Sequence, residues 1–313
     1  MKRALAFVAN YFKPQKAQGA VYKNGPGDII FHIINITVLL TFTVICILPF
    51  YFLFVNTISN EEYVARNMVT FWPRGFTLRN YFMLRDVGGF FQSLGVTIAR
   101  TVIGTALMVL LSSFAGYLFS KRTMWKRKLW YRLAIITMYF NAGLIPWFLT
   151  MMNLGLTDNF LGYIVPMMIA PFNIILVKTY VESIPKDIEE SAEIDGAGIL
   201  TIFLKIILPL SIPILATIAI FGAVAHWNSL QDSLILMQNS PNLFVLQHRL
   251  HIYLTQAGEL TQIIAEANPN RVIRDVRIIQ YTLAMASAIP IVLVYPLMQR
   301  FFIKGMMIGA VKG

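Results

Sequence analysis

Acidic side chains are concentrated in one short stretch of the chain. Of the 15 Asp and Glu residues, six lie within residues 182–195: Glu182, Asp187, Glu189, Glu190, Glu193 and Asp195. The surrounding sequence, SIPKDIEESAEIDGAG, is typical of a short helix, with Ser183 as its cap and Pro185 in its first turn. Gly196 permits the left-handed turn that ends a helix. We therefore expect a helix within residues 184–197.

One face of this expected helix is apolar, because Ile184, Ile188 and Ala192 recur at intervals of four residues. A short amphipathic helix without a neighbour of its own needs something to pack against. Lipid headgroups are one candidate, but six carboxylates beside an anionic leaflet would be repelled. A protein partner on the cytoplasmic face is therefore the favoured hypothesis.

The rest of the sequence offers little enzyme chemistry. We find no nucleophile, base and metal-ligand set of the kind a membrane-embedded enzyme would need, and no GxxxxGK[ST] phosphate loop that could bind ATP. His226, His248 and His251 show no metal-like spacing with cysteine or acidic partners, and Cys46 is the single cysteine. We expect the chain to be no enzyme by itself and to bind neither a metal nor a cofactor.

The composition predicts a membrane protein. Hydrophobic residues make up 57% of the 313 residues and charged residues only 13%, whereas a soluble domain has about 25% charged residues. A spanning helix needs about 20 mostly apolar residues, and six runs free of charge reach that length. The sequence thus predicts an all-α polytopic membrane protein whose six transmembrane helices cover about 29–55, 92–120, 130–152, 159–180, 202–226 and 278–301.

The positions of Lys and Arg predict the orientation. Sixteen of them fall in the N-terminal tail, the connections after the second and fourth helices and the C-terminal end, against eight in the other loops. Because cytoplasmic loops are enriched in these residues, both termini are expected in the cytoplasm. The predicted parts are a cytoplasmic tail 1–28, a transmembrane domain 29–303 with extracellular segments about 57–90 and 228–277, and a cytoplasmic tail 304–313. The basic N-terminal tail is therefore expected to lie on anionic lipid, and the net charge of +11 does not indicate nucleic-acid binding.

The acidic stretch carries a family resemblance. Glu190-Ser191-Ala192, then Gly196, then Ile206 and Leu208-Pro209 resemble the EAA loop of binding-protein-dependent ABC importer permeases, with serine at 191 where the family pattern has alanine. Asp195-Gly196-Ala197 and Phe203 resemble the carbohydrate branch of that family. Further resemblance extends over most of the chain, at Gly27–Asn35, Asn141–Pro146, His226–Ser229 and Lys304–Gly313.

The resemblance implies a role in sugar import. It implies a type I ABC importer transmembrane fold in the bacterial cell membrane, similar to the smaller maltose permease subunit, for an oligosaccharide or complex glycan. The implied partners are a homologous permease, an extracellular sugar-binding lipoprotein and two ATPase subunits that hold ATP and Mg. The implied contacts with the ATPase are Ile188, Glu190, Ser191, Ala192, Asp195, Gly196 and Ala197.

Four residues are candidates for the substrate pathway, and each has a plainer interpretation. Trp227 and Asn228 could stack on and hydrogen-bond a sugar, or Trp227 could belong to the interfacial aromatic belt or to the packed core. Asn141 could face the pathway or bond across helices. Arg100 could face a cavity, or its stem could extend to the outer headgroups.

Two other transporter classes remain as alternatives. An ion-coupled secondary transporter would be expected to carry an Asp or Glu as a coupling site within the membrane, and the six predicted helices have none in their interiors. An ABC importer for a solute other than a sugar is the second alternative.

Overall fold

The computed structural model describes residues 26–256 and 276–310, and side chains up to residue 296. All regular secondary structure in these residues is helical, as the sequence predicts. Three helices are long, continuous and apolar enough to cross a membrane: α2 (Pro26–Thr57), α5 (Phe90–Ser120) and α17 (Val276–Ala310). Each contains one of the predicted spans.

The other three charge-free runs are not single helices, which corrects the sequence prediction. Each forms two helical pieces joined at a bend of 117°, 48° or 82°, in chain order. In the first pair, α6 (Arg127–Tyr139) is followed by α7 (Leu144–Asn153). In the second pair, α8 (Leu161–Ile164) and η2 (Val165–Met167) form one piece and α9 (Pro171–Val181) forms the other. In the third pair, α11 (Ile199–Ile202), η3 (Phe203–Ile207) and α12 (Leu208–Leu210) form one piece and α13 (Ile212–Asn228) forms the other. Six spans result only if each bent pair crosses once.

Local residue chemistry explains the bends. Gly143, between α6 and α7, has a φ of +89°, and its N–H donates to the side chain of Asn141 at 2.8 Å. Pro171 and Pro213 lie within the first two positions of α9 and α13, where a missing N–H is tolerated. By contrast, Pro49 lies inside the continuous helix α2. A proline therefore marks a break here only where it begins a new helical piece.

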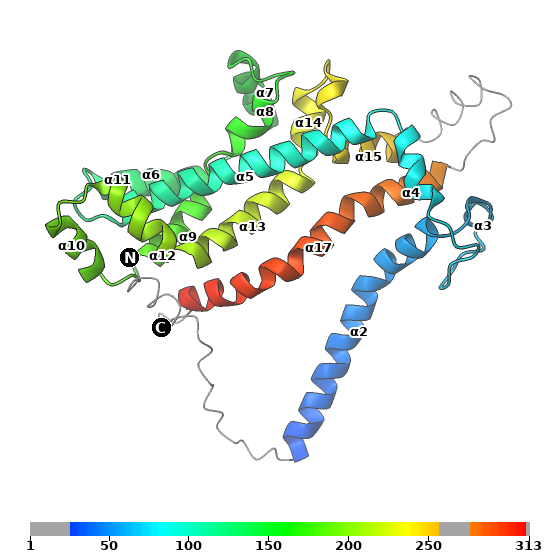
Figure 1. Ribbon diagram of the computed structural model, residues 1–313, viewed down its shortest axis with the longest axis horizontal. Coiled ribbons are helices and arrows are strands. Elements are labelled where there is room, and N and C mark those ends of the chain that lie inside the picture. Colours follow the sequence, from blue (N-terminus) through cyan, green and yellow to red (C-terminus); the bar gives the residue numbers. More distant parts are fainter. Residues whose placement is uncertain (1–25, 257–275, 311–313) are drawn as a thin grey trace.

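The helices form a layer with two distinct ends. Figure 1 shows α5, α13 and α17 running side by side, while α2 meets α17 near one end and then diverges from it. One end carries α10 (Asp187–Ile194), and the far end carries α3, α4 and α15. The remaining short helices are α3 (Glu61–Ala65), α4 (Arg79–Met83), η1 (Leu84–Asp86), α14 (Gln231–Leu236), η4 (Pro241–Leu243) and α15 (Leu246–Thr255).

A buried cluster fixes the end of the layer beside α10. The ring of Tyr117 on α5 stacks on Phe203 in η3, with ring centroids 5.5 Å apart. Gly116, the preceding residue, lets α5 approach α9 closely. A Cβ at this position would lie 2.8 Å from Cβ of Val177 and 3.0 Å from the carbonyl oxygen of Ile174. The absence of a side chain at position 116 therefore sets the distance between these helices.

This close approach makes a testable prediction. Gly116→Ala should lower the free energy of unfolding by about 1–3 kcal/mol, because the added methyl group overpacks the interface. Gly95→Ala on the same helix has no atom within 4 Å of its new Cβ, so it should instead raise stability by about 0.5–1 kcal/mol. Unfolding of both variants in detergent checks this, and equal effects would contradict the packing argument.

Candidate functional site

The apolar face of α10 packs against the chain itself. Ala192 is buried in the cluster that contains Tyr117 and Phe203, and Ile184 packs against the same cluster. The expectation that this face lacks a neighbour of its own is therefore wrong. Any partner of α10 must instead meet its outward face.

The start of α10 also differs from the prediction. The helix begins at Asp187, with Lys186 at the cap position and no side-chain capping bond. The hydroxyl of Ser183 donates to the carbonyl oxygen of Tyr180 at 2.6 Å instead of capping α10. Pro185 accounts for the later start, because proline disfavours helical backbone in the residue before it.

The end of α10 agrees with the prediction for Gly196. Its φ is +79°, in the left-handed region. The N–H of Gly196 donates to the carbonyl oxygen of Glu193, and the N–H of Ala197 donates to that of Ala192, both at 3.0 Å. These two bonds form a Schellman motif, which satisfies carbonyl groups that the helix end leaves free. Asp195 occupies the C-cap position.

Ion pairs hold α10 to the end of α5. Lys121, which follows α5, pairs with Glu189 and, at 2.8 Å, with Glu193. The hydroxyl of Tyr117 donates to Glu189 at 2.7 Å. Burial lowers the pKa of Lys121, but its hydrogen bonds to the two carboxylates outweigh that effect and raise the pKa above its ordinary value. The lysine therefore remains charged at neutral pH and the pairs persist.

The outward face of α10 combines negative charge with exposed apolar surface. Glu190, Ser191 and Asp195 are exposed, and 86% of Ile194 is accessible. Ile199 and Leu200, just beyond the helix, are exposed as well. Ile188 and Ala197 are half-buried, so they lie at the border between the packed face and the outward face. This surface suits a partner groove with apolar walls and a basic rim.

Arg100 lies within α5 as a fully buried charge. Its guanidinium donates to Asp232 at the start of α14, with Nη2 2.5 Å from Oδ2, and its Cζ lies 4.5 Å from the ring centroid of Tyr163. Nη1 also lies 3.3 Å from the carbonyl oxygen of Ser229. Because the side chain is fully buried and paired, it does not extend to the headgroups, which excludes one of the two interpretations.

Polar contacts continue outward from this pair. Asp232 also accepts from the hydroxyl of Ser229 at 3.0 Å, and Tyr163 donates to the carbonyl oxygen of Leu243 at 2.8 Å. Oγ of Ser233 lies 2.9 Å from both the Tyr163 hydroxyl and Nδ1 of His248. Burial, with the nearby Arg249 and His251, lowers the pKa of His248 to about 4. At neutral pH this imidazole is therefore uncharged.

On the other side of Arg100, His226 is fully buried against Gly104. A Cβ at residue 104 would lie 2.4 Å from both Cε1 and Nε2 of the imidazole. Within the described residues, neither nitrogen of His226 has a hydrogen-bond partner. The ring thus occupies space that only a glycine on α5 leaves open.

Asn141 and Asp232, the partner of Arg100, line the same cavity. It has a volume of about 350 Å³ and is lined by Asn141, Trp147, Gln231, Asp232 and neighbouring residues of the α6–α7 bend and of η2. Amide, carboxylate and indole groups thus border the same space. In the described residues, no group of three or more His, Cys, Asp or Glu side chains could hold a metal ion.

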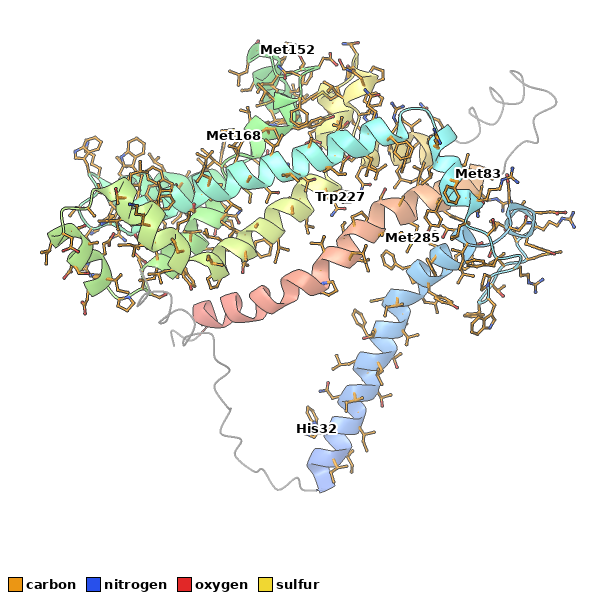
Figure 2. All side chains as sticks on the ribbon, viewed as in Figure 1. His32, Met83, Met152, Met168, Trp227 and Met285 are labelled. Atoms are coloured by element: carbon orange, nitrogen blue, oxygen red, sulfur yellow. The ribbon has the colours of Figure 1, made fainter. Side chains whose placement is uncertain are left out.

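Trp227 and Asn228 lie elsewhere. The indole of Trp227 is buried among Leu246 and Leu283, and its N–H donates to the carbonyl oxygen of Ser287 at 2.9 Å. Figure 2 shows Trp227 at the end of α13, next to α17. This arrangement favours its packing interpretation. Asn228 is exposed and donates to the carbonyl oxygen of Val224 at 3.0 Å.

Comparison with known proteins identifies the family. The model of the family described as "Binding-protein-dependent transport system inner membrane component" matches residues 108–308, which is more than half of the chain. The chain belongs to this family. This permease is accordingly a multi-pass protein of the bacterial plasma membrane and a component of a transport system.

Relatives of this permease cover almost all of it. The polygalacturonan/rhamnogalacturonan transport system permease protein YtcP of Bacillus subtilis is 35% identical over 88% of this chain and 96% of its own. Protein LplC of the same organism is 35% identical over 91% of this chain and 95% of its own. The arabinooligosaccharides transport system permease protein AraQ of Halalkalibacterium halodurans is 27% identical over 86% of this chain and 92% of its own.

A solved structure supports the fold of the permease. It is a chain of a bacterial ABC transporter involved in the import of the acidic polysaccharide alginate. The TM-score is 0.82 at 30% identity, over 89% of this chain and 99% of that chain. The overall arrangement of the helices is thus one already known in an ABC transporter.

Sequence reasoning missed Asp232, the partner of Arg100. A signal was present, because Asp232 is the one acidic residue between Asp195 and Glu259 and directly follows the charge-free run that ends at Gln231. A lone acid beside an apolar helix and a lone base within another predict an ion pair. The roles of Tyr163, Trp147 and Gln231 had no comparable signal, since uncharged residues of these types are ordinary in such helices.

The buried pair yields a prediction for this permease. Arg100→Leu should lower the free energy of unfolding by about 3–5 kcal/mol, because Asp232 is left buried without its partner. The double variant Arg100→Leu with Asp232→Leu should recover most of that loss. Arg132→Gln, which removes an exposed arginine, should change stability by less than about 0.5 kcal/mol. Unfolding in detergent measures all three, and a double variant as unstable as Arg100→Leu would refute the pairing.

Proposed function

We propose that the chain is one permease subunit of an ATP-driven importer for an oligosaccharide or complex glycan. The observation that carries this proposal is the near full-length similarity to permeases whose names specify polygalacturonan, rhamnogalacturonan and arabinooligosaccharides. The similarity to a chain of an alginate importer supports the same substrate class. A homologous permease completes the pathway, and an extracellular binding protein delivers the glycan.

In this proposal α10 is the coupling element. Two ATPase subunits hold ATP and Mg, and the outward face of α10, with Glu190 and Ile194, sits in a groove on one of them. When the ATPases close on ATP, the groove moves α10, and the Lys121 ion pairs transmit the displacement to the end of α5. Because α5 is one continuous helix from Phe90 to Ser120, the movement reaches Arg100 as a rigid-body shift.

The substrate path passes the cavity at Asn141 in this proposal. The rim of Asn141, Gln231 and Asp232 offers donors and acceptors for hydroxyl groups, and Trp147 offers an aromatic face. Arg100 compensates the charge of Asp232, so the rim repels an acidic glycan less than an unpaired carboxylate would, and a neutral glycan meets no uncompensated charge. Trp227 and Asn228 lie outside the lining of this cavity, and a sugar contact at Asn228 stays a prediction.

Coupling through α10 can be tested with two substitutions. Leucine at position 196 must adopt a φ near +79°, at a cost of about 1–2 kcal/mol, so Gly196→Leu should displace the end of α10. Glu190→Lys reverses an exposed charge on its outward face. In both variants, ATP hydrolysis in reconstituted vesicles should no longer respond to the sugar-loaded binding protein, and oligosaccharide uptake should fall with it.

The matched control is Gly198→Leu. Its φ is −73°, and a Cβ there meets nothing within 4 Å, so stimulation should stay near the original level. All variants should reach the membrane in near-normal amounts and leave sugar binding by the separate binding protein unchanged. Full stimulation and full uptake in both Gly196→Leu and Glu190→Lys would remove α10 from the mechanism.

The proposed orientation has six spans with both termini in the cytoplasm. In a Cys46→Ala background, Lys128→Cys and Asp187→Cys should react with a membrane-impermeant maleimide only from inside, and Arg85→Cys only from outside. These three residues are exposed, so labelling reports sidedness rather than burial. The reverse pattern would invert the topology, and a single discordant site would change the number of spans.

A further inference from the structure

A second cavity lies between the end of α5 and the loop that leads into α10. Its volume is about 330 Å³, and it is lined by Ser120, Arg122, Arg127, Val181, Glu182 and residues 184–186, 188, 189 and 207. It is therefore bordered by the C-terminal end of α5, the first turn of α6, the segment between α9 and α10, the start of α10 and the end of η3. It is separate from the cavity at Asn141, with which it shares no lining residue.

The carboxylates at this cavity are already paired. Glu182 accepts from Arg127 at 2.5 Å and from Lys178 at 2.8 Å. Glu189 pairs with Lys121 and accepts the hydroxyl of Tyr117. Glu182 thus has two cations, and Glu189 shares Lys121 with Glu193, so both carboxylates are already engaged.

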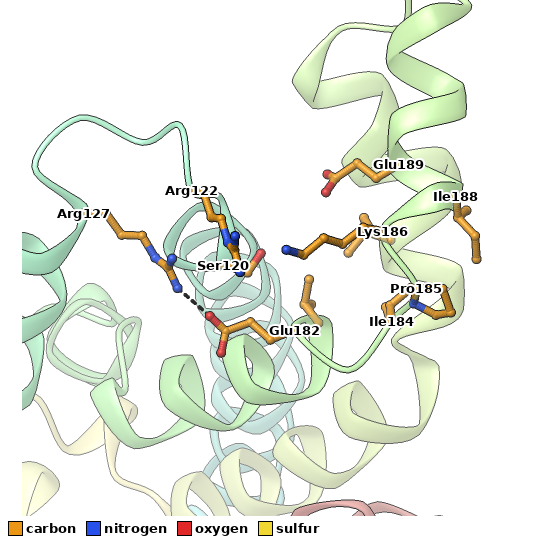
Figure 3. Close-up of a pocket in the computed structure, with 11 residues that line it drawn as sticks. Ser120, Arg122, Arg127, Glu182, Ile184, Pro185, Lys186, Ile188 and Glu189 are labelled. Atoms are coloured by element: carbon orange, nitrogen blue, oxygen red, sulfur yellow. Dashed lines mark hydrogen bonds and ion pairs between the residues drawn. The ribbon is translucent and has the colours of Figure 1, made fainter.

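Two cations at the cavity have no partner. Within the part of the chain that the structure describes, the side chains of Arg122 and Lys186 are exposed and make no hydrogen bond and no ion pair. Figure 3 shows both side chains extending toward the same space, with Ser120 between them. Like charges that face one another repel, and the repulsion is relieved when an anion lies between them. An anion placed between these two exposed cations would therefore be favoured.

We propose that this cavity binds a phosphate group, held between Arg122 and Lys186. A guanidinium matches phosphate oxygens with two parallel N–H bonds, and an ammonium binds phosphate as a point charge. The volume exceeds what a single carboxylate fills and accommodates a phosphate ester. Because the cavity lies at the ends of α5 and α9, a lipid headgroup and a soluble phosphate compound can both supply that group.

Occupancy has a consequence for α10. Arg122 follows α5 by two residues, and Lys186 directly precedes α10. A phosphate that bridges them adds a second attachment between these elements, next to the Lys121 ion pairs. The site can therefore stiffen or release α10 according to whether the anion is present. This inference rests on the geometry of the cavity and does not depend on the nature of the transported solute.

The complete transporter provides the test, in two arms. In a maltoside detergent, which carries no phosphate, equilibrium dialysis with radiolabelled inorganic phosphate measures the soluble source. In discs that contain phosphatidylglycerol, native mass spectrometry counts the lipids retained. The double variant Arg122→Gln with Lys186→Gln should weaken binding roughly tenfold or more in at least one arm, because two charge-assisted contacts are lost.

The matched control is Lys128→Gln with Lys205→Gln, which removes the same charge from exposed positions outside the cavity. Its affinity for phosphate or lipid should stay within about twofold of that of the original protein, since distant exposed charges are screened. Arg122→Lys keeps the charge but loses the planar fork, so its affinity should be intermediate. Phosphate held by other subunits is common to all variants and cancels in the comparison.

Each outcome decides the proposal. Loss confined to the phosphatidylglycerol arm identifies a lipid headgroup, and loss confined to the phosphate arm identifies a soluble compound. Binding in the double variant equal to that of the control overturns the site. The same conclusion follows if neither ligand binds and the double variant merely releases the ATPase subunits, because the two cations then serve a protein interface.

Discussion

A buried arginine inside an apolar helix constrains the structure around it. Arg100 is fully buried, and a charge in that position requires a partner held in fixed geometry. Asp232 meets this need from α14, and Tyr163 of α8 covers the guanidinium. Two elements that are far apart in the sequence, α8 and α14, are thereby held at one point on α5. Asp232, the acidic member of the pair, also lines the cavity at Asn141.

The opposite end of α5 uses the same chemistry at the surface. Lys121 joins α10 to α5 through two carboxylates, and the ring of Tyr117 packs beneath them. One uninterrupted helix therefore separates a half-exposed ionic attachment from a fully buried one. Displacement at either end is transmitted because α5 has no internal proline or bend at which it could be absorbed.

Sequence patterns predicted the features that depend on local chemistry. Gly196 ends α10 in the left-handed conformation because few other residues tolerate it, and the charge-free runs locate the long helices. The patterns did not predict that α6 and α7 turn through 117°, since apolar runs look alike whether straight or bent. Nor could spacing alone reveal that Ala192 faces the chain's own core, because an amphipathic stripe does not specify what covers it.

The contact between Gly104 and His226 limits how this sequence can change over time. An imidazole fills the space above residue 104 so closely that even a methyl group there would overlap the ring. Replacement of Gly104 alone is therefore selected against while histidine remains at 226. Replacement of His226 by a smaller residue removes that restriction and opens position 104 to alanine or serine. Over evolutionary time, these two positions on α5 and α13 should vary together in size.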